Sequence, residues 1–175
     1  MEKVLLIFAV AIAAAGAAED VRCSRIPNWL TYSGLLAALI IRGALLGWPG
    51  LKAGLLGVVA AAGLFYILFL VGGMGGGDVK LMAAVGASVG VGQAVALLIS
   101  AAVTGGLLGI VYAVFYRRIG GTLRNTFELV RHHVTTGFQP HPDLNIQQPT
   151  TMRVPYGLAI ALGTFYCVGN AFLRG

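Results

Sequence analysis

The segment VGGMGGGDVKL (residues 71–81) separates two long apolar runs and carries one acid, Asp78, at the edge of the second run. Five of its eleven residues are glycine. Glycine adopts backbone conformations that other residues rarely reach, so this segment predicts a break between two helices. An ionisable side chain at the end of a membrane helix is costly, which marks Asp78 as a candidate functional residue.

The composition on either side of this segment is that of an integral membrane protein. The chain has 175 residues, of which 58% are hydrophobic and 10% are charged, and its mean hydropathy is +0.86. A soluble domain this apolar would lack the polar surface needed to cover its core. The length fits one domain, residues 1–175. The net charge is +6, but the basic residues are scattered between apolar runs, so we expect them to set membrane topology and expect no nucleic-acid partner.

Six apolar segments are predicted to be helices, which makes the fold class all-α and polytopic. A helix needs roughly 20 residues to cross the hydrocarbon core. The segments cover residues 4–18, 29–46, 51–71, 79–91, 94–116 and 154–173. The first could pass for a secretory signal, but Arg22 and Arg25 follow it at once, which favours a retained membrane helix. The short segment GVGQ (residues 90–93) predicts a tight turn between the fourth and fifth helices.

The distribution of Lys and Arg predicts that the N-terminus lies outside. With six crossings, eight basic residues fall inside and four, including Arg42, fall outside, as the positive-inside rule favours. One long polar stretch, residues 117–153, is then a cytoplasmic loop. Its residues 123–134 have apolar side chains at helical spacing, which predicts an amphipathic helix on the membrane surface. Glycines four apart, at 86 and 90 and at 105 and 109, predict close packing between helices.

The same topology brings two acids to one membrane face. Asp20 ends the first helix and Asp78 begins the fourth, both on the cytoplasmic side. Two carboxyl groups held close together cannot both ionise easily, so the pair shares one proton. The ionised member can take a proton from water while the protonated member polarises a peptide carbonyl, which is the requirement for amide hydrolysis without a metal or cofactor. Alternatively, Asp78 merely caps its helix and Asp20 flanks another.

Other chemistries have weaker support in the sequence. The zinc-protease motif H-E-x-x-H is absent. The three histidines and one acid lie together in the polar loop, where a solvated side chain is commoner than a metal ligand. These residues are His132, His133, His141 and Asp143. Ser88 lies in GASVG, a formal match to G-x-S-x-G, but within an apolar helix rather than a strand–turn–helix. We therefore expect no metal and no cofactor. A small transporter or channel that uses the two acids as a proton or cation site remains the alternative from another class.

Three segments resemble the prepilin peptidases, a family of membrane aspartyl proteases. GGGD (residues 75–78) matches their GxGD signature, and GGGDVKLMAAVGASVG resembles the region around their second aspartate. DVRCSRIPNWLT (residues 20–31) is similar to the region around their first aspartate, and VPYGLAIALG (residues 154–163) resembles their final-helix motif. Leu158 departs from that motif, because many members have proline there.

The resemblance implies both an activity and its residues. Asp20 and Asp78 would be the catalytic pair, and Gly75, Gly76 and Gly77 would provide a backbone that an extended substrate can approach. The reaction would remove the leader peptide from prepilin or pseudopilin precursors at the cytoplasmic face of the inner membrane, with membrane lipid around the enzyme. The chain lacks a C-x-x-C pair, so the methyltransferase part of the larger members is expected to be missing. It resembles the short Tad/Cpa-type form, and the archaeal preflagellin peptidases remain an alternative.

Overall fold

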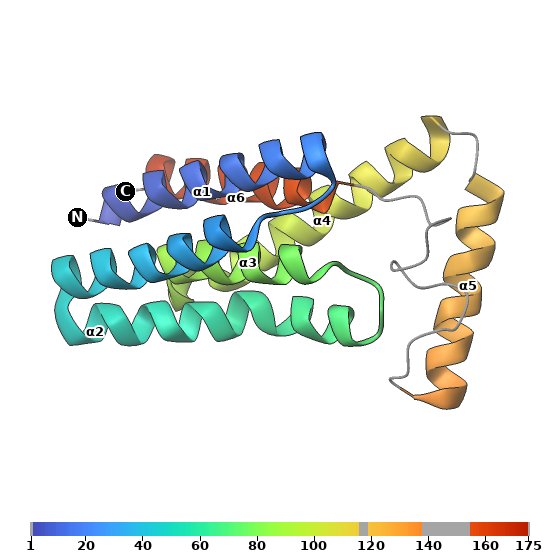
Figure 1. Cartoon of the computed structure of the whole chain (residues 1–175), viewed down its shortest axis with the longest axis horizontal. Coiled ribbons are helices and arrows are strands. Elements are labelled where there is room, and N and C mark those ends of the chain that lie inside the picture. Colours follow the sequence, from blue (N-terminus) through green and yellow to red (C-terminus); the bar gives the residue numbers. More distant parts are fainter. Residues whose placement is uncertain (1, 116–118, 138–154, 175) are drawn as a thin grey trace.

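The computed structural model describes residues 2–115, 119–137 and 155–174, and every regular element within these ranges is a helix. The prediction of an all-α fold is therefore confirmed for this part of the chain. The helices are α1 (Glu2–Cys23), α2 (Asn28–Leu70), α3 (Gly76–Val89), α4 (Val91–Phe115), α5 (Ile119–Thr136) and α6 (Tyr156–Arg174). Figure 1 shows a bundle of antiparallel helices, with α5 lying across one end of it.

The helix α2 consists of two arms that run side by side in opposite directions (Figure 1). The arms meet at Gly47, whose φ of 64° and ψ of −156° are non-helical. A positive φ is open to glycine at little steric cost, and Pro49 lacks the N–H that would continue the preceding helix. The two arms, residues 28–46 and 48–70, therefore correspond to the second and third predicted apolar segments.

The turn between α3 and α4 is even tighter than the sequence indicates. It consists of Gly90 alone, with φ 77°, and the Gly90 N–H donates to the carbonyl oxygen of Gly86 at 2.9 Å. The predicted reversal of direction is thus confirmed, and a left-handed glycine makes it possible.

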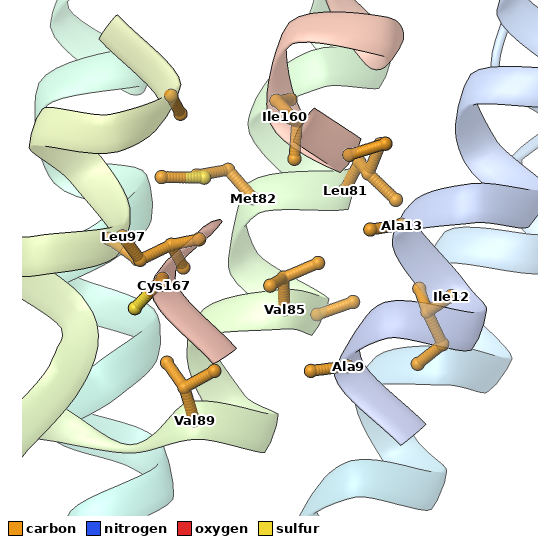
Figure 2. Packing of buried hydrophobic residues seen from close by; sticks show 14 of the residues in the cluster. Ala9, Ile12, Ala13, Leu81, Met82, Val85, Val89, Leu97, Ile160 and Cys167 are labelled. Atoms are coloured by element: carbon orange, nitrogen blue, oxygen red, sulfur yellow. The ribbon is translucent and has the colours of Figure 1, made fainter. Parts of the chain in front are cut away.

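The helix α3 lies at the centre of the bundle. Its side chains Leu81, Met82 and Val85 are completely buried, and Figure 2 shows them facing residues of α1, α4 and α6. Small residues permit this dense packing: a Cβ at Gly86 would lie 2.6 Å from the carbonyl oxygen of Gly57 in α2. The predicted packing role of Gly86 is therefore confirmed. Gly109 in α4, by contrast, faces open space.

Arg42 has a different role from the flanking charge that the sequence indicates, because it is only 7% exposed. Its Nε donates to the carbonyl oxygen of Gly50 at 3.1 Å, and its Nη1 donates to that of Ser88 at 2.6 Å. A buried cation is tolerated where hydrogen bonds replace its hydration. Arg42 thus joins both arms of α2 to the C-terminal end of α3.

Four helices in the described part of the chain are long and apolar enough to cross a membrane, namely α1, α2, α4 and α6. Large hydrophobic side chains on their outer faces are exposed, such as Ile40, Val59 and Ile110. Exposed apolar surface on this scale fits contact with lipid rather than with water. The central helix α3 has 14 residues and is roughly 21 Å long at 1.5 Å per residue, which is shorter than the hydrocarbon core of about 30 Å. Most of its residues are buried among the surrounding helices.

The predicted amphipathic helix in the polar loop is present as α5. Its side chains Phe127 and Val134 lie seven residues apart and are 70% and 81% exposed, so they share one uncovered apolar face. Figure 1 shows α5 at the end of the bundle where α4 ends and α6 begins. The second half of the loop, including His141 and Asp143, lies outside the described residues.

Candidate active site

The structure brings Asp20 and Asp78 together. Asp20 lies in the last turn of α1 and Asp78 in the first turn of α3, and Figure 1 shows these two helix ends at the same end of the bundle. Each side chain is only 9% exposed, and the two carboxyl groups are close enough to interact electrostatically. Acids that are 58 positions apart in the sequence (78 minus 20) thus form one buried pair.

Asp20 contacts the start of the final helix. The backbone N–H of Gly157 donates to its Oδ2 at 2.8 Å. The first N–H groups of a helix have no partner within that helix, and the preceding residue, Pro155, has no polar side chain to supply one. The acid on α1 therefore caps α6.

Asp78 rests against the glycine segment that precedes it. Its carboxyl group interacts with the Gly75 backbone, and a Cβ at Gly75 would lie 3.0 Å from its Oδ2. Helix capping therefore accounts for one contact at each acid. Capping does not require two buried carboxyl groups to lie within electrostatic range of each other, so it leaves this feature of the arrangement unexplained.

The other two glycines of the motif differ in how much space they have. A Cβ at Gly77 would lie 3.1 Å from the Cβ of Ile26, in the connection between α1 and α2, whereas one at Gly76 would lie 3.4 Å from the Phe69 ring, at an ordinary contact distance. Gly77 therefore allows the start of α3 to pack against the chain that follows Asp20. The space around Gly76 gives no comparable reason for a glycine.

A lysine links α3, which carries Asp78, to the start of α2. The Lys80 Nζ donates to Asn28 Oδ1 at 2.8 Å and lies 5.0 Å from the centroid of the Tyr32 ring. Lys80 follows Asp78 by two residues, and Asn28 begins α2. This contact fixes the first turn of α3 against α2, and the separate motifs in the sequence do not reveal it.

Tyr156 is a site residue that sequence reasoning missed. It interacts electrostatically with Asp78, its ring meets Phe65 edge-on with centroids 5.9 Å apart, and it packs against Gly105 of α4. The signal was its place directly after a proline at the start of the last apolar segment. The position of Tyr156 in the sequence does not predict that it lies near Asp78, because Asp78 belongs to a distant part of the chain.

The rival site residues do not assemble in the part of the chain that the structure describes. No group of three or more His, Cys, Asp or Glu there could hold a metal. Ser88 lies within α3, completely buried, and its Oγ donates to the carbonyl oxygen of Ala84 at 2.9 Å. This setting excludes the nucleophile turn that G-x-S-x-G requires. The two cysteines are free, with Cys23 exposed and Cys167 buried.

Comparison with known proteins identifies the family. The profile of the type IV leader peptidase family matches residues 5–110, which is more than half of the chain and includes both acids and the glycine segment. Searches of curated proteins and of solved structures found no match. Members of the family are aspartic peptidases that act on prepilin-like precursors, and the apolar helices agree with a membrane protein. This chain therefore belongs to the type IV leader peptidase family.

Proposed function

We propose that this protein is a membrane aspartic endopeptidase that removes the leader peptide from type IV pilin-like precursors at the cytoplasmic face of the inner membrane. The observation that carries the proposal is the buried pair formed by Asp20 and Asp78 at one end of the bundle. Two carboxyl groups that share one proton provide both the base and the acid for peptide hydrolysis.

The reaction proceeds by attack of a water molecule on the scissile peptide bond. The ionised carboxylate takes a proton from the water as its oxygen bonds to the carbonyl carbon, and the protonated carboxyl group donates its proton to the carbonyl oxygen. The resulting tetrahedral intermediate loses the amine as the carbon–nitrogen bond breaks. The amine accepts a proton from the newly protonated carboxyl group, and one hydroxyl of the intermediate returns its proton to the other carboxylate, which restores the pair. The products are the leader with a new carboxylate and the mature chain with a new amine. This chemistry requires no metal and no cofactor.

The proposed topology has six crossings with the N-terminus outside. The two arms of α2 count as two crossings. The helix α3 counts as one crossing, although it is packed inside the bundle. Both acids then face the cytoplasm, as the excess of inside Lys and Arg favours. The exposed Arg124 and Arg131 of α5 lie at the same end of the bundle, which agrees with this orientation.

Labelling of Cys23 tests the orientation. Cys23 is exposed at the end of α1, three residues after Asp20, whereas Cys167 is buried. A membrane-impermeant maleimide should therefore label Cys23 in inverted vesicles and not in right-side-out vesicles. The Cys23→Ser variant should lose the label and keep its peptidase activity, since no thiol takes part in the reaction. Labelling from the outside alone would reverse the proposed topology.

Cleavage assays test the function itself. Purified protein in liposomes should shorten candidate precursors, and N-terminal sequencing of the product should locate the cut. The product should remain unmethylated when a methyl donor is present, because we propose that the methyltransferase part is missing. Cleavage confined to preflagellin precursors would favour the archaeal-type alternative. Ion flux through the liposomes without any cleavage would favour a transporter.

The apolar face of α5 is proposed to rest on the membrane and to border the path of the substrate. Replacement of Phe127 and Val134 with serine should slow cleavage of a full-length, membrane-embedded precursor several-fold, because the helix would lose apolar contact with lipid. Cleavage of a short soluble leader peptide should not change. The matched control is Thr135→Ser, an exposed position on the same helix. Equal rates for both substrates in the double variant would show that α5 does not border the path.

A further inference from the structure

The first turn of α6 contacts Asp20 directly and lies within electrostatic range of Asp78. The Gly157 N–H donates to Oδ2 of Asp20 at 2.8 Å in a buried position, and the preceding residue, Tyr156, interacts electrostatically with Asp78. The start of the last helix thus holds the carboxyl group of α1 and lies near that of α3. This part of α6 lies outside the segment matched by the family profile, which ends at residue 110.

The space around Gly157 explains why a glycine occupies this position. A Cβ there would lie 2.9 Å from the Cβ of Asp20 and 3.0 Å from its Oδ2. A contact under 3.0 Å between such atoms forces one of them to move. Only glycine therefore brings the backbone N–H within hydrogen-bonding distance of Asp20 without displacing the carboxyl group.

We propose that Gly157 is a positioning residue for hydrolysis: its backbone N–H holds Oδ2 of Asp20, so that the other oxygen stays directed at the reacting water. The proposal rests on the proposed function, because it assigns a part to Gly157 within that reaction. A hydrogen bond to a carboxylate is among the stronger ones in proteins. Because the Gly157 N–H is fixed in a helix, this donor does not have to reorient during the reaction.

The first experiment compares three glycine-to-alanine variants of α6. Gly157→Ala should lower kcat by roughly 100-fold with little change in KM, because displacement of a reacting group by about 1 Å has effects of this size. Gly169→Ala is the neutral control, since nothing lies within 4 Å of that position. Gly163→Ala is the packing control, since its Cβ would lie 2.6 Å from the backbone nitrogen of Ala101, and its nearest atoms all belong to Ser100 and Ala101 rather than to either acid.

The second experiment reads the contact without relying on activity. The infrared carboxyl band of Asp20 is identified as the band that disappears in Asp20→Asn. It should shift in Gly157→Ala and stay in place in Gly163→Ala and Gly169→Ala. If wild-type protein cleaves no precursor, the proposed function fails, whereas the band still decides whether Gly157 holds Asp20.

A backbone ester at position 157 separates the loss of the N–H from the added Cβ. It can be introduced by joining a synthetic segment that carries α6, and it adds no side chain that could prevent folding. The ester should lower kcat and shift the Asp20 band as Gly157→Ala does. The proposal is wrong if the ester protein keeps wild-type kcat and an unshifted band. It is also wrong if Gly163→Ala produces the same loss of kcat and the same band shift.

Discussion

Asp20→Asn and Asp78→Asn should each reduce precursor cleavage by about 100- to 10,000-fold, which is the usual contribution of an acid or base catalyst. Asparagine keeps the shape of aspartate but cannot exchange a proton as the acid does. It is also as good a helix cap as aspartate, so the amide oxygen introduced by Asp20→Asn can still accept the N–H of Gly157. The fold should therefore survive, and the measurements are cleavage rate and thermal unfolding of each purified variant.

The neighbouring acid provides a matched control for this prediction. Glu19→Gln removes one carboxylate next to Asp20 but leaves the buried pair untouched, and Glu19 is only partly buried. Its cleavage rate should stay close to that of the wild type. Substantial cleavage by either folded aspartate variant would refute the catalytic pair.

Gly57→Ala should destabilise the protein and abolish most of its activity. The new Cβ would overlap the carbonyl oxygen of Gly86 and lie 2.9 Å from the backbone of Gly90. These are backbone atoms at the C-terminal end of α3, which cannot move aside as a flexible side chain can. Overpacking of a dense core costs about 1–3 kcal/mol. Because α3 also carries Asp78, its displacement should reduce cleavage as well as the unfolding temperature in detergent.

Gly63→Ala is the control for this variant, because Gly63 lies in the same arm of α2 and nothing lies within 4 Å of it. Alanine has a higher helix propensity than glycine, so this change should leave stability equal or slightly higher. An unfolding temperature for Gly57→Ala equal to that of Gly63→Ala would show that α2 and α3 tolerate a wider separation.

The sequence alone determined which segments are helices and where the chain reverses. Apolar runs of sufficient length can satisfy their backbone in lipid only as helices, and Gly90 and the 71–77 segment mark the interruptions. The alternating direction of successive helices then predicted that Asp20 and Asp78 reach the same end. That prediction required only a count of the helices between the two acids, and it agrees with the structure because the sequence marks each of those helices clearly.

The tertiary structure alone decided which side chains meet across helices. Whether Arg42 is a flanking charge or a buried donor to Ser88 depends on how α2 is rotated about its axis. Whether Gly157 touches Asp20 depends on the depth at which α6 packs beside α1. Helical periodicity fixes which residues of a helix share a face. It does not fix the neighbour that this face meets, because that choice is made by the close fit of small residues between helices.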